Sequence, residues 1–247
     1  MLRSIQEITG YKIQSLDGNV GKAADFYFDD VGWFVRYVVT DTGGWLTGRK
    51  VLVSPEAFGE PQWRDGLIPV HLSRRTIEES PPIDEHAPVH RENEGRLRAF
   101  YGWPNWWSTP MHGLLVPSAR EVVEAQTREA PVATEERDPS LRSSGEVRGY
   151  HIAARDGEIG HVSDFIVDDA TWAIRYLVVD TRNVLPGKKV LLSPHWISEV
   201  RWTDEKVAVD QTTEQIREAP EFDPSEPINR EQETRLYDFY GRPKYWE

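Results

Sequence analysis

The sequence repeats itself without a gap. Residues 10–107 align with residues 149–246 at a constant offset of 139, and about 42 of the 98 aligned positions are identical. Self-similarity at a fixed offset is the signature of a duplicated structural unit. A chain of 247 residues is long enough for one large domain or two small ones, and the repeat decides for two of the same kind. We therefore predict a pseudo-twofold pair of related domains.

The predicted division follows from composition. The first unit spans residues 1–107 and the second residues 143–247, each with a helix and tail at its end, and residues 108–142 form a linker rich in Pro, Ser, Ala and Glu. The net charge of −12 divides into −3, −2 and −7 over these three segments. A chain this acidic is disfavoured as a nucleic-acid binder, and its second unit would attract cations or basic surfaces.

Residue types that are absent exclude several kinds of chemistry. There is no cysteine, which excludes disulfides, thiolate metal sites and a cysteine nucleophile. No apolar run approaches the ~20 residues of a membrane span, and the first residues lack the apolar stretch of a secretion signal. We therefore expect a soluble, cytoplasmic protein without a transmembrane segment.

Hydrophobic patterning predicts a mainly β fold with short helices. Short alternating or β-branched runs recur every 8 to 12 residues with turns such as Asp17-Gly18 between them, which is typical of small antiparallel barrels or sandwiches. The expected strands of the first unit lie near residues 11–15, 24–30, 33–39, 50–54, 61–63 and 67–71. Helices are expected at residues 73–79 and 92–101, and in the second unit from Thr212, where Thr212 and Gln215 form a capping-box pattern.

The order of these elements resembles the PRC-barrel, a small antiparallel β-barrel. The resemblance rests on G-x-x-x-D-F-x-x-D-D, W-x-x-R-Y and K-V-L-x-S-P in both copies. The positions that carry it are Gly21, Asp25, Trp33, Arg36, Tyr37 and Lys50 to Ser54, with Gly160, Asp164, Trp172, Arg175, Tyr176 and Lys189 to Ser193. PRC-barrels occur in the cytoplasmic part of the H subunit of photosynthetic reaction centres and in a ribosome maturation factor, so the resemblance implies two tandem barrels of bacterial type that act through protein contacts, with no shared catalytic residue.

Polar residues within the repeat suggest structural roles. Asp25, Asp29 and Asp30, with Asp164, Asp168 and Asp169, could hold Ca²⁺ or Mg²⁺, but their spacing matches no EF-hand loop. We expect instead that Asp25 and Asp164 pair with Arg36 and Arg175 on the neighbouring strand. The seven histidines never align between copies, so we expect no metal, no cofactor and no enzymatic activity.

Each unit ends in an aromatic tail, E-x-x-L-x-x-F-Y-G-x-P-x-x-W. Its aromatic residues are Phe100, Tyr101, Trp103, Trp106 and Trp107 in the first unit, and Phe239, Tyr240, Tyr245 and Trp246 in the second. If these rings are exposed, they form a patch that could bind a partner. If they are buried, they close a barrel, either that of their own copy or that of the other copy. We expect packing that joins the two copies, with a homo-oligomer through exchanged tails as an option.

The function expected from these features is a non-enzymatic protein-interaction or scaffold module with an unidentified protein partner. The alternative is a peripheral accessory of a photosynthetic reaction centre or another membrane electron-transfer complex, similar to the H subunit.

Overall fold

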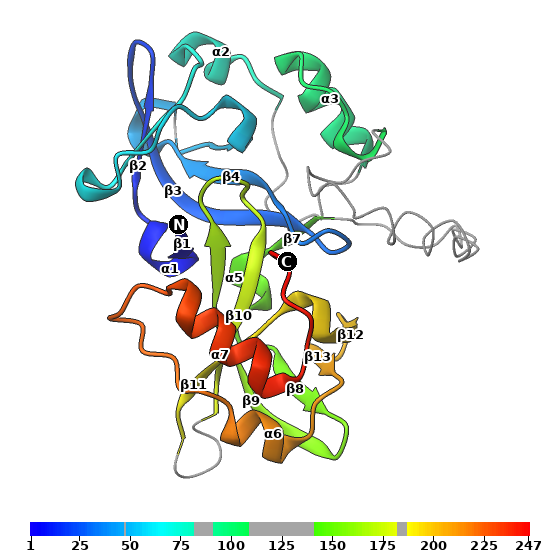
Figure 1. The fold of residues 1–247 in the computed structure, drawn as a ribbon. Coiled ribbons are helices and arrows are strands. Elements are labelled where there is room, and N and C mark those ends of the chain that lie inside the picture. The colour runs from blue at the N-terminus through cyan, green and yellow to red at the C-terminus, as the bar shows by residue number, and fades with distance from the viewer. Residues whose placement is uncertain (47, 82–90, 109–140, 182–186) are drawn as a thin grey trace.

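Two β-sheets, one built mainly from each repeat, form the framework of the computed structural model, and short helices surround them (Figure 1). The mainly β fold confirms the fold class predicted from the sequence. The structure describes residues 1–46, 48–81, 91–108, 141–181 and 187–247. Of the predicted linker, residues 109–140 lie outside the described residues, and strand β7 begins at Leu141, inside its expected end.

The first sheet has the strand order β5-β4-β3-β2-β6, and β7 pairs with β3. Its own strands are β2 (Lys12–Ser15), β3 (Gly18–Asp29), β4 (Val35–Asp41), β5 (Lys50–Val53) and β6 (Leu67–Pro69). Most pairs are antiparallel as predicted, but β2 and β6 run parallel. The expected strand at residues 61–63 is absent from the described residues; a 3-10 turn occupies Trp63–Asp65 instead.

The second sheet repeats this order as β11-β10-β9-β8-β13-β12, and β1 pairs with β9. Its own strands are β8 (His151–Ala154), β9 (Gly157–Asp168), β10 (Ile174–Asp180), β11 (Lys189–Leu192), β12 (Ile197–Arg201) and β13 (Lys206–Val209). In the first half, residues 58–62 and 67–70 correspond to the β12–β13 hairpin. These two segments are joined by isolated bridges, between Phe58 and Val70 and between Gln62 and Leu67.

The two halves exchange their first strands. Strand β1 (Leu2–Ser4) pairs with β9 of the second half, and β7 (Leu141–Ser143) pairs with β3 of the first half. The two registers are equivalent, because Ser4 pairs with Ile166 and Ser143 pairs with Tyr27. Ser143 is the counterpart of Ser4, and Ile166 is the counterpart of Tyr27, at the same offset of 139. Each repeat therefore begins with an L-R-S segment that completes the sheet of the other repeat.

The pseudo-twofold contact is centred on two tryptophans in the left-handed backbone region. Trp33 has φ 57° and Trp172 has φ 59°. The carbonyl of Trp172 accepts from the backbone N–H of Val35 at 2.8 Å, and the carbonyl of Trp33 accepts from Ile174 at 2.7 Å. The sequence predicted that β4 starts at Trp33, but it starts at Val35, because Trp33 belongs to the preceding turn and its carbonyl pairs with the other half.

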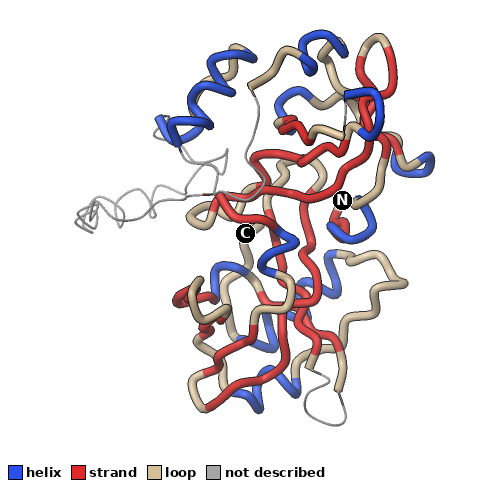
Figure 2. Tube along the Cα trace, turned by 180° about the vertical axis from the view of Figure 1, so that it is seen from behind, coloured by secondary structure: helices blue, strands red, loops and turns tan. Residues whose placement is uncertain are grey.

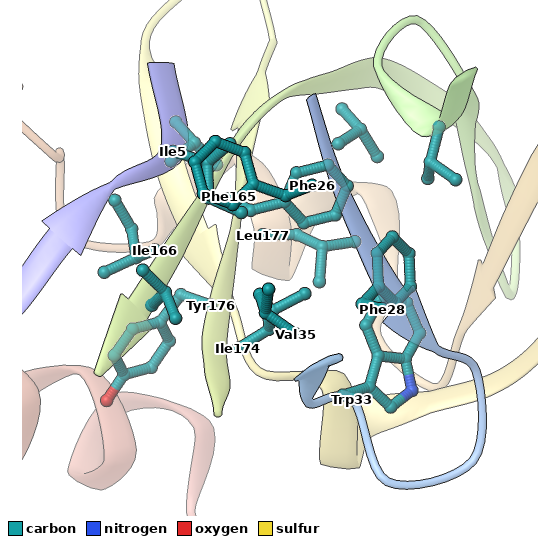
Figure 3. Packing of buried hydrophobic residues seen from close by; sticks show 14 of the residues in the cluster. Ile5, Phe26, Phe28, Trp33, Val35, Phe165, Ile166, Ile174, Tyr176 and Leu177 are labelled. Atoms are coloured by element: carbon teal, nitrogen blue, oxygen red, sulfur yellow. The ribbon is translucent and has the colours of Figure 1, made fainter. Parts of the chain in front are cut away.

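The core is continuous across this contact (Figure 3). Phe28 packs against Phe165 with ring centroids 5.6 Å apart, and Phe26 lies 6.5 Å from Trp172. Strands of both halves meet at the centre of the molecule (Figure 2). The halves are thus joined by strands and core rings, whereas the sequence predicted that the aromatic tails would join them.

Short helices lie against the sheets, and five of them begin after a residue whose side chain caps the first turn: Ser4, Ser73, Ser143, Thr212 and Asn229. They are α1 (Ile5–Ile8), α2 (Arg74–Glu78), α3 (Arg91–Tyr101), α5 (Ser144–Val147), α6 (Thr213–Glu218) and α7 (Arg230–Tyr240), with 3-10 turns at Gly43–Leu46, Pro55–Ala57, Trp63–Asp65, Trp106–Ser108 and Pro194–Trp196. The predicted capping box at Thr212 and Gln215 is present, and Gly241 in the left-handed region ends α7.

Gly21→Ala tests the close approach between the central strand β3 and the end of β4. Gly21 has φ +154°, and an added Cβ would lie 1.9 Å from the carbonyl oxygen of Asp41. We expect a loss of at least about 3 kcal/mol in the free energy of unfolding, because the neighbouring backbone must move. Urea unfolding measures it. The control is Gly95→Ala in α3, where a Cβ meets nothing within 4 Å and stability should rise by up to about 1 kcal/mol; equal effects would contradict the prediction.

Candidate functional site

Asp29 holds the turn that carries Trp33. Its side chain is fully buried and accepts hydrogen bonds from the N–H groups of Gly32 and Phe34 and from Arg36 Nε at 2.8 Å. In the second half the less buried Asp168 accepts from the N–H of Ala170 at 3.2 Å and from the Thr171 hydroxyl at 3.0 Å, and it pairs with Arg175 at 3.2 Å. The pairing of Asp25 and Asp164 with these arginines, expected from the sequence, is therefore wrong, because the arginines reach the carboxylate at the end of the preceding strand.

Asp25 and Asp164 instead bind the exchanged segments. Asp25 accepts from Ser143, from Ser144 Oγ at 2.7 Å and from the N–H of Gly145 at 3.0 Å. The equivalent Asp164 accepts from Ser4 and from the N–H of Gln6 at 3.1 Å. Burial raises the pKa of Asp164 above its ordinary value. Both carboxylates act as caps that fix the first helix of one half onto the sheet of the other.

The aromatic tail of the first half packs on its own half. Trp103 stacks on Tyr101 with centroids 4.3 Å apart, and Trp106 donates from Nε1 to Glu94 at 2.5 Å. The guanidinium of Arg36 lies 4.3 Å from the Trp106 ring centroid, and Trp107 meets Trp106 edge-on.

The second tail repeats this arrangement with different residues. Tyr245 donates to Glu233 at 2.8 Å and lies under the guanidinium of Arg175. Trp246 packs edge-on against Tyr237 at 5.1 Å, and Tyr240 lies 4.7 Å from Trp196. In both halves the ring contacts of the tail described above stay within one repeat.

Each tail is anchored by a buried glutamate that the sequence analysis left without a role. Tyr37 donates to Glu94 at 2.8 Å, and Tyr176 donates to Glu233 at 2.7 Å. The signal was present in the sequence, because the Glu of E-x-x-L is identical in both copies and lies on the same helix face as the buried Leu97. A strand tyrosine, a helix glutamate and a tail ring thus form one network in each half.

The two networks differ in charge. Glu233 forms an ion pair with Arg230 at 3.0 Å. Glu94 has one carboxylate oxygen without a hydrogen-bond partner, and burial raises its pKa above the ordinary value. Near it, Arg98 is 1% exposed and binds the Tyr37 hydroxyl and Glu56.

One aromatic residue of each tail faces solvent. Phe100 is 40% exposed and Phe239 is 41% exposed, and these are equivalent positions of the repeat. Each packs edge-on against the tyrosine that follows it, with the same centroid distance of 5.0 Å and the same angle of 83°. The tails therefore have a packed face and an exposed phenylalanine.

No group of three or more His, Cys, Asp or Glu side chains that could hold a metal ion occurs among the residues that the structure describes. His86, His90 and His112 lie outside them. Within the same described ranges, no helix is both long and apolar enough to cross a membrane.

A comparison with protein families identifies one domain in this chain. The model of the PRC-barrel domain family matches residues 142–216, from the exchanged strand β7 to helix α6. The second repeat thus carries a PRC-barrel domain, whereas a second tandem barrel and the resemblance to the H subunit stay predictions. No curated protein matches the chain.

Asp25→Ala tests the cap between the halves. The substitution removes the acceptor for Ser143, Ser144 and the N–H of Gly145, so we expect a loss of about 2 kcal/mol in the free energy of unfolding. Urea unfolding measures this loss. Asp65→Ala, at an exposed position of the same half, is the control and should change stability by less than about 0.5 kcal/mol; a similar loss in both variants would contradict the role of Asp25.

Glu94→Gln tests the buried carboxyl through the pH dependence of stability. Because the pKa of Glu94 is raised in the folded protein, the folded state binds the proton more tightly than the unfolded state. Ionisation of the Glu94 carboxyl therefore lowers the free energy of unfolding as the pH rises above 4.5, the ordinary pKa of a glutamate. Measured by chemical unfolding, Glu94→Gln should gain stability relative to the wild type as the pH rises from about 4 to about 7, through the range in which carboxyl groups titrate.

The matched variant is Glu233→Gln, which loses the ion pair with Arg230 and should be less stable than the wild type at neutral pH. If Glu94→Gln showed no change relative to the wild type across the same range, the charge state of Glu94 would not contribute to stability.

Proposed function

We propose that this protein is a non-enzymatic interaction scaffold whose two halves each present a contact surface around one exposed phenylalanine. The observation that supports this most is the pair Phe100 and Phe239. Single exposed apolar residues are common on protein surfaces. Here, however, the same large ring is exposed at the same position of two copies that differ at more than half of their aligned residues.

The environment of these rings favours a contact role over a packing role. Neighbouring tail residues differ between the copies although they are more buried than the phenylalanines: Trp106 corresponds to Tyr245, and Trp103 corresponds to Arg242. Phe100 and Phe239 have not changed, although about two fifths of each side chain is exposed. Exposed aromatic side chains supply much of the binding energy in protein interfaces.

The duplicated polar residues support a role without catalysis. Asp25 and Asp29 bind backbone groups, and Glu94 binds the strand tyrosine and the tail. Each is thus committed to an internal contact that holds the fold, and the equivalent residues of the second half have the same partners in kind.

The arrangement of the halves favours a partner with two binding sites. Helices α3 and α7, which carry the two phenylalanines, belong to halves that are tied together by exchanged strands (Figure 1). Two contacts held at a fixed separation increase the apparent affinity for a partner whose own sites match that separation. The second half is the more acidic, so the partner site that meets it carries basic residues.

The test is affinity capture from a lysate of the source organism with the full chain as bait. Phe100→Ser combined with Phe239→Ser should lose at least one protein that the wild type retains, because both ring contacts are removed. Val31→Ser, which changes an apolar side chain that is 72% exposed in a turn, is the control and should retain it. An identical set of captured proteins for all three baits, with folding verified by circular dichroism, would contradict the proposal.

A further inference from the structure

Two histidines lie opposite each other on neighbouring strands of the second sheet. His151 of β8 is the register partner of His161 of β9 in their antiparallel pair. His151 is exposed and His161 is partly exposed, whereas the next residues of these strands, Ile152 and Val162, are buried in the core. Because side chains alternate between the two faces of a sheet, both imidazoles lie on the outer face. They are neighbours there, although ten positions separate them in the sequence.

The backbone hydrogen bonds make this the closer of the two kinds of antiparallel pair. The N–H of His151 donates to the carbonyl of Glu205, on the side of β8 that faces β13, at 2.8 Å. An adjacent bond between β8 and β9 runs from the N–H of Val162 to the carbonyl of Tyr150, also at 2.8 Å. A pair flanked in this way has no hydrogen bond within itself, and its Cβ atoms lie about 4.5–5.5 Å apart. Two imidazoles that start at this separation can direct one nitrogen each to a shared ion.

The two imidazoles are available to a ligand and lie between carboxylates. Neither imidazole forms a hydrogen bond or an ion pair with a residue in the described part of the chain. Glu158 interacts electrostatically with His151 and forms an ion pair with Lys206 at 2.6 Å. On the other side, Asp180 of β10 is the register partner of His161. Carboxylates beside metal-binding imidazoles orient the rings and strengthen the nitrogen as a ligand, so these neighbours favour a bound cation.

The first half has the same strand pair with different side chains. Lys12 of β2 and Lys22 of β3 are register partners, and they occupy the positions equivalent to His151 and His161. A protonated lysine has donors but no lone pair, so it cannot bind a metal ion. One backbone arrangement thus carries metal-ligating side chains in the second half alone, and the first half shows that the sheet accepts lysine at both positions.

We propose that His151 and His161 form a two-histidine clamp for a divalent transition-metal ion of the Zn²⁺ class. Imidazole nitrogen is a preferred ligand of such ions, whereas Mg²⁺ and Ca²⁺ prefer oxygen. The two imidazoles bind the ion from adjacent strands, and water fills the remaining coordination positions. The clamp lies on the sheet, apart from Phe100 and Phe239, so it does not depend on the proposed contact role of these phenylalanines.

The test is isothermal titration calorimetry of Zn²⁺ with the full chain, free of metal and without an affinity tag, at a pH of about 7.5, where imidazole is mostly uncharged. The wild type should bind Zn²⁺. His151→Lys and His161→Lys, which restore the residues of the first half, should each weaken binding at least about tenfold, because one of the two ligands is lost. No Zn²⁺ binding by the wild type, or the same affinity in both variants, would overturn the proposal.

The matched control is His71→Lys, the same substitution at an exposed histidine of the first half, which should keep the wild-type affinity. An equal loss in this variant would show a general charge effect and overturn the assignment. Thermal unfolding gives a second readout, because an ion that binds the folded state raises its melting temperature. Excess Zn²⁺ should raise the melting temperature of the wild type and of His71→Lys more than that of His151→Lys. If a lysine variant does not fold by circular dichroism, His151→Gln or His161→Gln replaces it.

Discussion

The reciprocal exchange of the strands β1 and β7 is the constraint on which the rest of the structure depends. Each sheet needs the L-R-S segment of the other repeat, and Asp25 and Asp164 bind those segments through their serines and backbone N–H groups. The left-handed turns at Trp33 and Trp172 follow from the same contact, since each carbonyl accepts from the opposite half. A left-handed conformation is unfavourable for tryptophan, and the hydrogen bonds and ring packing across the halves offset its cost.

The sequence was sufficient for the duplication, the mainly β fold and most strands, because these leave periodic patterns that are visible along the chain. The sequence was insufficient to predict that the two halves exchange their first strands. The continuous repeat begins at Gly10 and Gly149, and the short segment Leu2, Arg3 and Ser4, which recurs as Leu141, Arg142 and Ser143, lies ahead of it. A three-residue strand carries almost no periodic signal, and which sheet it joins depends on contacts between residues more than 100 positions apart. The wrong partner assigned to Arg36 has the same origin, because two carboxylates, Asp25 and Asp29, both precede it at plausible spacing.

The candidate sites were only partly visible for a related reason. Aromatic tails attract attention as contact residues, yet most of their rings are turned inward, and only burial separates Phe100 from its neighbour Tyr101. Glu94 and Glu233 have the pattern of ordinary helix residues in the sequence, and their role depends on Tyr37 and Tyr176, which donate to them from distant strands.

Fusion of the two copies in one chain also explains why the contact between them is not symmetric. Trp33 stacks on Phe28 of its own half at 5.1 Å, but the position equivalent to Phe28 is Val167 in the second half. Trp172 therefore packs on rings of the first half, Phe26 and Phe58. In a dimer of identical chains every substitution would occur on both sides of the axis, whereas a fused pair can place a large ring on one side and a small side chain on the other. The halves have thereby become complementary to each other, and neither presents to the other the surface that a second copy of itself would present.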